Sequence, residues 1–253
     1  MKNVTLNGHR LSFYDAIEDL SISQFHKYSK YMLVEGGIGD SIESIDAHIN
    51  KIGEFIKVDA EKAMRELMNL RQCIYMVANE QDIANKAMLC LVKEVDGKKW
   101  EDFSDGGIDE LYRMVCGEQL RAFYKLRKEV LEKIDAELKI YFPSLFVGTD
   151  ERNKLELMRK RALLQLAQIT EGVNNNEEIA KLTSQIMQCE EVKSFEGTNS
   201  AEVEFDRQFE EMCLVLSKEF GGGIKNYSVM EFYSAYMKLE KDAKELQKLK
   251  KRK

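Results

Sequence analysis

The stretch LVEGGIGDSIESIDAHI, from Leu33 to Ile49, places three glycines in four residues directly before an apolar helical pattern. Glycine readily ends a helix in the left-handed region, and a short polar side chain caps the helix that follows. The stretch therefore predicts two helices joined at a tight corner, with Gly36 or Gly37 ending the first and Asp40 or Ser41 capping the second. The predicted helix corner comprises Gly36, Gly37, Gly39 and Asp40.

Glycines before a helix also occur where a protein binds phosphate. A P-loop needs a lysine followed by Ser or Thr after its last glycine, and Gly39 is followed by Asp40 instead. A dinucleotide fingerprint needs a preceding strand, whereas the residues before these glycines have a helical pattern. Gly37-Ile38-Gly39 resembles the centre of a DNA-binding helix-hairpin-helix, although Glu35 and Glu43 beside it are acidic. A DNA-binding module is therefore a further alternative for the function.

The composition favours helices along most of the chain. The 253 residues include one proline, Pro143, with 44% hydrophobic and 32% charged residues. Proline interrupts a helix because it lacks a backbone N–H and clashes with the preceding turn. The chain is long enough for one large domain or two smaller ones. We expect a mainly α fold: a multi-helix bundle with a short N-terminal β-hairpin and a long C-terminal helix.

Charge, cysteines and hydropathy indicate a protein made in the cytosol and independent of membranes. The net charge of −6 disfavours nonspecific nucleic-acid binding by the whole molecule. No apolar run is long enough to span a bilayer, and the first residues lack the apolar core of a signal peptide. We expect reduced and mainly buried thiols, since none of the cysteines forms a CxxC pair. These are Cys73, Cys90, Cys116, Cys189 and Cys213.

The N-terminal residues 1–13 carry the one strong β signal. Val4 and Leu6 alternate with polar neighbours, as do Leu11 and Phe13, and Asn7-Gly8 between them favours a type I′ turn. An isolated two-stranded hairpin is marginally stable in water. Its apolar face must therefore pack on a helix, or its edge must be covered by another chain.

Helical patterns follow almost without interruption. Capping boxes are predicted at Ser21 with Gln24 and at Ser228 with Glu231, and Asp59 is a predicted N-cap. DIANKAMLCLVKEV, residues 82–95, is expected to be one helix. Two further helices show apolar stripes at helical spacing: Ile42, Ile45, Ile49, Ile52 and Ile56 in one, and Ala63, Met64, Leu67, Leu70 and Ile74 in the other.

Three consecutive domains are predicted. Residues 1–148 hold the hairpin and a helical domain, and residues 149–193 form a helical hairpin. Residues 194–253 hold a linker, whose best candidate is SFEGTNSAE at 194–202, and the C-terminal helices. We expect the amphipathic segments to present more apolar surface than one subunit can bury, so that copies or other proteins cover the rest.

Candidate catalytic groups are few. His26, Asp46 and His48 lie near the helix corner, but no HExxH, GxSxG or Cys/His pattern accompanies them. The two histidines are expected at the surface or in satisfied contacts. We expect no enzyme activity, no cofactor and no metal.

The C-terminal helix is the best candidate for contact with a partner. It begins with aromatic side chains and ends with a basic cluster, which suits an acidic partner or nearby DNA, although lysines also suit the negative end of a helix dipole. With two residues of the hairpin, the predicted partner-binding residues are Val4, Leu6, Tyr227, Phe232, Tyr233, Tyr236, Lys248, Lys250, Lys251, Arg252 and Lys253.

The chain resembles helical structural and assembly proteins of tailed bacteriophages. The resemblance rests on the hairpin VTLNGHRLSF, the dense helical segment SISQFHKYSKYMLVEGGIGDSIESIDAHINKI and the charged terminal helix after NYSVMEFYSAYMKLEK. The Lys-, Asn-, Met- and Ile-rich, proline-poor usage also resembles crAss-like phages. The family includes neck or head–tail connector ring subunits and tail-assembly chaperones.

This resemblance implies a virion protein without catalytic residues. A connector subunit would form a ring with copies of itself between portal and tail, around the DNA channel, and would contact other phage structural proteins. It would be made in the host cytoplasm and incorporated into the virion. The alternative is a tail-assembly chaperone, which would hold another protein's apolar surface and leave before the particle matures.

Overall fold

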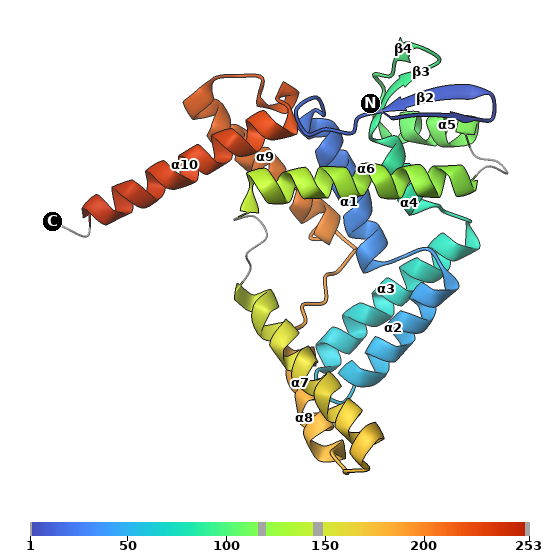
Figure 1. Cartoon of the computed structure of the whole chain (residues 1–253), viewed down its shortest axis with the longest axis vertical. Helices are drawn as coiled ribbons and strands as arrows, with labels where there is room; N and C mark the ends of the chain where they lie inside the picture. The colour runs from blue at the N-terminus through green and yellow to red at the C-terminus, as the bar shows by residue number, and fades with distance from the viewer. Residues whose placement is uncertain (1, 116–119, 144–148, 251–253) are drawn as a thin grey trace. The chain divides into compact units, whose positions relative to one another are not determined.

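The structure is a computed structural model that describes residues 2–115, 120–143 and 149–250. The chain divides into two compact units, each built from separate segments (Figure 1). The first unit contains Met1–Gly36, Asp82–Pro143 and Glu202–Lys253, and the second contains Gly37–Gln81 and Ser144–Ala201. This division differs from the consecutive domains expected from the sequence, because segments far apart in the chain pack together in each unit.

A four-stranded antiparallel sheet lies in the first unit. Its order is β1 (Lys2–Leu6), β2 (His9–Phe13), β3 (Val92–Val95) and β4 (Lys98–Lys99). The predicted N-terminal hairpin is confirmed, with Asn7 and Gly8 at φ angles of 47° and 82°. The expected helix at 82–95 is wrong in its second half, because Asp96-Gly97 makes a second turn of the same kind, at 51° and 78°. Residues 92–95 therefore pair with β2 instead of continuing the helix.

The helices of the first unit surround one apolar core that also buries one face of the sheet. The predicted capping box at Ser228 is present: Ser228 N donates to Glu231 Oε2 at 2.8 Å, and Glu231 N donates to Ser228 Oγ at 3.2 Å. These helices are α1 (Ile22–Gly37), α4 (Ile83–Leu89), α5 (Asp105–Val115), α6 (Leu120–Tyr141), α9 (Ala201–Phe220) and α10 (Val229–Lys250). The predicted mainly α fold with a long C-terminal helix is confirmed.

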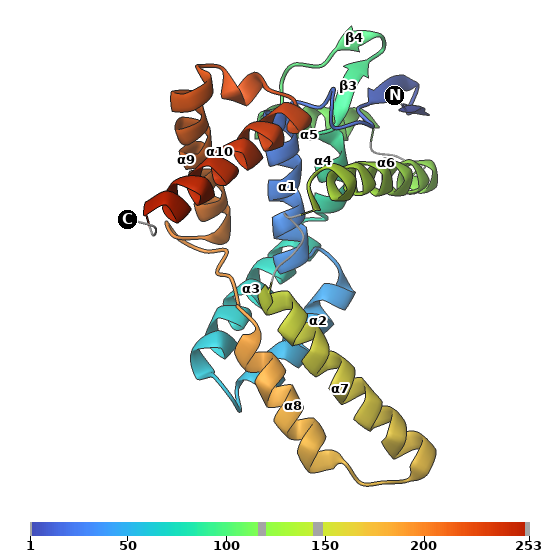
Figure 2. The same ribbon diagram turned by 60° about the vertical axis from the view of Figure 1, so that its left-hand side comes forward.

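Two helical hairpins make up the second unit (Figure 2). One joins α2 (Ile42–Phe55) to α3 (Ala60–Ala78), whose predicted N-cap Asp59 accepts from the backbone N–H groups of Glu61 and Lys62. The other joins α7 (Thr149–Glu171) to α8 (Asn176–Cys189). A small apolar cluster joins the two hairpins and contains Phe55, Ala63, Ile186, Met187 and Val192. Among the described residues, no helix is long and apolar enough to cross a membrane.

Candidate functional site

The glycine corner is a helix connection, as predicted, but its glycines act differently. Helix α1 continues to Gly37, and Gly39 has the left-handed φ angle, at 72°. Ser41, one of the two expected caps, is the N-cap of α2 and accepts from Ser44 N at 3.2 Å. Ile38 and Gly39 are both buried. Two of the three residues at the expected helix-hairpin-helix centre are therefore covered by the rest of the protein.

Gly37 has a packing role. A Cβ atom there would lie 2.1 Å from Cζ of Phe195, which is buried although it belongs to the predicted linker. A Cβ at Gly36 would meet nothing within 4 Å. Only the second of these neighbouring glycines is thus required by its surroundings.

Substitution of Gly37 by alanine is expected to destabilise the second unit by about 1–3 kcal/mol, because Phe195 must move from a packed position. Gly36→Ala provides the matched control and should be neutral or slightly stabilising, since alanine favours a helix over glycine. Urea unfolding of both variants measures the difference. Equal stabilities would show that Phe195 does not restrict this position.

A buried polar pair holds the corner on the α2–α3 hairpin. His48 and Glu66 are 5% and 3% exposed, and His48 Nδ1 lies 2.9 Å from Glu66 Oε1. His48 Nε2 lies 2.7 Å from the backbone oxygen of Ile38. Because a carbonyl oxygen can only accept, Nε2 donates to it, and Nδ1 shares a proton with the carboxylate.

The pair changes the titration of both groups. The hydrogen bond to Glu66 raises the pKa of His48 above its ordinary value, against the effect of burial. Burial alone would raise the pKa of Glu66, but the bond to His48 and the charge of Lys51 outweigh it and bring that pKa below its ordinary value. The pair therefore favours an imidazolium facing a carboxylate inside the second unit.

Helix α3 buries two polar side chains and exposes several large apolar ones. Glu66 and Asn69 are buried, and Asn69 Nδ2 donates to the backbone oxygen of Lys193 at 2.9 Å. The opposite face is 40–60% exposed at each of five large apolar side chains. We call these the α3 outer face: Met64, Leu67, Met68, Ile74 and Tyr75. Most of the predicted stripe of this helix is thus left outside the core.

The α3 outer face is hollowed. A groove of about 410 Å³ is lined by Leu67, Met68, Leu70, Arg71 and Ile74. Apolar exposure continues on the neighbouring elements of the same unit. Ile42, Ile49 and Ile56 of the α2 stripe are exposed, and so are Leu155, Leu163, Leu166 and Ile169 of α7. The α3 groove gathers several apolar side chains of the α3 outer face on one surface, and exposed apolar patches mark interaction sites in soluble proteins.

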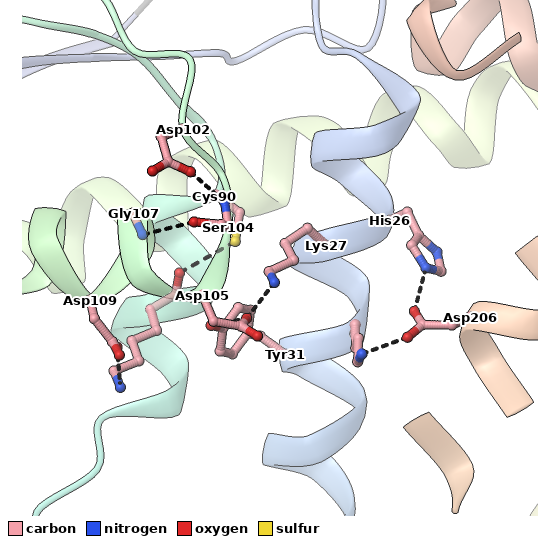
Figure 3. Close-up of polar contacts among 12 residues, drawn as sticks. His26, Lys27, Tyr31, Cys90, Asp102, Ser104, Asp105, Gly107, Asp109 and Asp206 are labelled. Carbon is pink, nitrogen blue, oxygen red and sulfur yellow. Dashed lines mark hydrogen bonds and ion pairs between the residues drawn. The ribbon is translucent and has the colours of Figure 1, made fainter. Parts of the chain in front are cut away.

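The first unit contains a cleft of about 880 Å³ beside α1 and α9, and Figure 3 shows two of its lining residues, His26 and Asp206. His26 Nε2 lies 2.9 Å from Asp206 Oδ1, and the ring stacks on Phe205 and Phe209 with centroids 4.6 and 3.9 Å away. Lys30 Nζ donates to the other oxygen of Asp206 at 2.6 Å. Burial lowers the pKa of His26, although Asp206 acts in the opposite direction. The ring is therefore mainly neutral near pH 7 and packs as an aromatic side chain.

The lysines near the cleft are paired with carboxylates. Figure 3 shows Lys27 reaching Asp105, which also accepts from the hydroxyl of Tyr31. Lys225 Nζ lies 2.6 Å from Glu210 Oε1, and Lys99 Nζ lies 3.7 Å from Glu101 Oε1. Of these pairs, Lys27 with Asp105 connects two helices far apart in the sequence, α1 and α5. No group of three or more potential metal ligands occurs among the described residues.

The predicted partner-binding residues fall into three groups. Leu6 and Phe232, at 3% and 2% exposed, lie in the core of the first unit and are not available to a partner. An apolar pattern is the same for a core and an interface, and these two side chains belong to the core. Half-buried side chains that pack against or beside this core are Val4, Tyr227, Tyr233 and Tyr236.

The basic end of α10 is described only in part. Lys248 is exposed. Lys251, Arg252, Lys253 and the side chain of Lys250 lie outside the described residues, as does Cys116. The role of this basic cluster stays a prediction.

Comparison with known proteins finds no matching family model, no matching curated protein and no matching solved structure. Sequence reasoning located the apolar stripes of α2 and α3 but not the side that faces outward. Glu66, Asn69 and Gln72 form a polar line on α3 opposite its apolar residues, and such a line ordinarily predicts an exposed polar face, so the sequence carried no signal for the reversed orientation.

Proposed function

We propose that this protein is a non-enzymatic structural subunit that assembles with copies of itself and with other proteins. The specific form that we propose is a neck, head–tail connector or tail ring subunit of a tailed bacteriophage virion, made in the host cytoplasm. The phage assignment rests on the resemblance of the sequence. The assembly role is supported by one observation above all, the α3 outer face.

The magnitude of the apolar exposure supports an assembly role. Fully burying one large apolar side chain contributes about 1.5–3 kcal/mol. The five half-exposed side chains of the α3 outer face would then contribute roughly 4–7 kcal/mol, and a similar face on the partner doubles this. Association costs about 4–15 kcal/mol, so a contact between two such faces can form a stable complex.

Charge placed on the α3 outer face is expected to break the assembly. We expect the wild-type protein to have a solution mass that is a multiple of 29.3 kDa. Leu67→Lys with Ile74→Lys should lower that mass, because two ammonium groups would be desolvated in the interface. Light scattering after size exclusion measures the mass, and circular dichroism checks that the helices remain.

A matched control introduces the same charge elsewhere on the second unit. Ala180→Lys with Gln188→Lys adds two lysines at exposed positions of α8 and should leave the mass unchanged. A wild-type protein that stays monomeric at every concentration would contradict the assembly role. An unchanged mass in the α3 variant would show that this face is not the contact.

A tail-assembly chaperone is the second candidate, and the methionines of the α3 outer face favour it. Met64 and Met68 are flexible and polarizable, and such side chains adapt to different apolar partners. Mass spectrometry of purified virions separates the two candidates. A structural subunit is retained in the particle, whereas a chaperone is present in infected cells and absent from purified particles.

A further inference from the structure

Helix α2 carries a continuous exposed line beside its packed face. The line consists of Ile42, Asp46, Ile49, Gly53 and Ile56, and all five residues are exposed, the isoleucines by 52–68%. Their spacing alternates between four and three residues, which is the repeat of a helix–helix seam. We call these five residues the α2 seam.

Gly53 is a second, independent sign that another backbone approaches here. It lies inside α2, where glycine is unfavourable relative to alanine. A Cβ atom at this position would meet nothing within 4 Å, so no contact within the described chain requires glycine. A helix of another molecule that crosses between Ile49 and Ile56 would require it.

The two sides of the α2 seam differ in accessibility. His48 and Phe55 lie on one side and are buried against the second unit's core. Glu43 and Lys57 lie on the other side and are exposed. In a parallel pair of these helices, the exposed side of one copy would face the buried side of the other. In an antiparallel pair, the two exposed sides, with Glu43 and Lys57, face each other. The open seam therefore suits an antiparallel helix.

A second copy of α2 fits the α2 seam in residue size. With Ile49 of both copies at a two-fold axis, Ile42 of each copy faces Ile56 of the other. In the same register Asp46 faces Gly53, where there is no side chain to obstruct it. Both halves of the contact are then the same, as an isologous interface requires.

The charges are compatible with the same register. Glu43 lies in the first turn of α2 and Lys57 lies just beyond its last turn, and neither forms an ion pair within the described residues. In the antiparallel arrangement Glu43 of each copy lies beside Lys57 of the other. Two reciprocal ion pairs would then flank the isoleucines.

We propose that two copies of this chain pair through antiparallel contact of their α2 seams, with Glu43 of each beside Lys57 of the other. This inference rests on the proposed assembly function and makes it more specific. The pairing joins two subunits and uses none of the five side chains of the α3 outer face, which is left for further contacts.

Charge exchange tests the pairing. Glu43→Lys alone and Lys57→Glu alone each replace two attractive contacts by two repulsive ones, and should weaken dimerisation about tenfold. The double variant Glu43→Lys with Lys57→Glu should restore most of the affinity. Sedimentation equilibrium measures the dissociation constants, and higher salt should reduce the differences. Equal affinities for all four proteins would overturn the proposed pairing.

Cross-linking tests the register independently. In a chain with Cys116→Ser and Cys189→Ser, Ile49→Cys should link to itself through a short bismaleimide. Ile42→Cys should link only when mixed with Ile56→Cys. Self-linking of Ile42→Cys with no link in the mixture would overturn the antiparallel arrangement.

Gly53→Leu separates the pairing from the fold. Leucine should be accommodated in the isolated subunit, because the position is open, and should weaken dimerisation at least tenfold. Unchanged dimerisation would overturn the close approach at Gly53. The two proposals fail separately: if only the α3 outer-face variants lower the mass, the assembly role holds and the α2 pairing is wrong.

Discussion

Replacement of His48 by alanine should lower the stability of the second unit by about 3–5 kcal/mol, one of the two largest losses that we expect. The variant leaves the buried Glu66 carboxylate with Lys51 Nζ at 3.7 Å and Asn69 Nδ2 at 3.5 Å. It also removes the donor to the Ile38 oxygen at the end of α1. Hydrogen exchange of the α2 and α3 backbone amides in urea measures the loss in this unit.

An exposed pair of the same chemistry provides the control. His9 Nδ1 lies 2.8 Å from Asp96 Oδ2, but both side chains are well exposed to water. His9→Ala should therefore change stability little, since water solvates the remaining carboxylate. A His48→Ala loss as small as that of His9→Ala would mean that the buried pair does not hold the corner.

The same pair predicts how the stability of the second unit depends on pH. The raised pKa of His48 contributes stability that is complete below about pH 6.5 and is lost as pH rises through the folded-state value. The lowered pKa of Glu66 contributes stability that is complete above about pH 4.5 and is lost as pH falls. Stability from the pair is greatest between these values. His48→Gln should remove the decline on the alkaline side.

Phe232→Ala should cost the first unit a similar amount, about 3–5 kcal/mol. Phe232 is buried, with its ring edge-to-face on Tyr233 at 5.6 Å between centroids and 6.0 Å from Phe209. Truncation leaves a cavity among α9, α10 and the rest of the core. Urea unfolding followed by the near-ultraviolet signal of the aromatic side chains measures the change.

Tyr236→Ala is the control on the same helix. Tyr236 is half-buried, so its truncation should cost less. If Phe232 were instead an anchor for a partner, the isolated Phe232→Ala subunit would keep its stability and lose only the partner. That outcome would support the prediction from the sequence that Phe232 binds a partner.

Local features of the fold were predictable because short-range chemistry determines them. Asn7-Gly8 needs only its own positive φ angles to form the hairpin turn, and Asp59 needs only the backbone N–H groups of Glu61 and Lys62 to cap α3. The strand at 92–95 was missed because its pairing with β2 depends on residues about 80 positions away. A helical pattern in the preceding residues concealed it.

The candidate site was predictable in its residues but not in its orientation. The spacing of Leu67 and Ile74 shows that they share one face of a helix. The spacing does not show whether this apolar face is buried. In the structure the face is exposed, and Glu66 and His48 are buried. A buried ion pair is recognised only when its two halves, 18 residues apart, are brought together.

The interleaved connectivity has a consequence for synthesis on the ribosome. The polypeptide passes between the two units four times, and the first unit takes its final helices from Glu202–Lys253. Its core is incomplete until α9 and α10 have been translated, because Leu216 and Phe232 belong to that core. The amino-terminal half of the nascent chain therefore exposes apolar surface until these helices are made. A premature stop codon before α10 should yield a product that aggregates or is degraded.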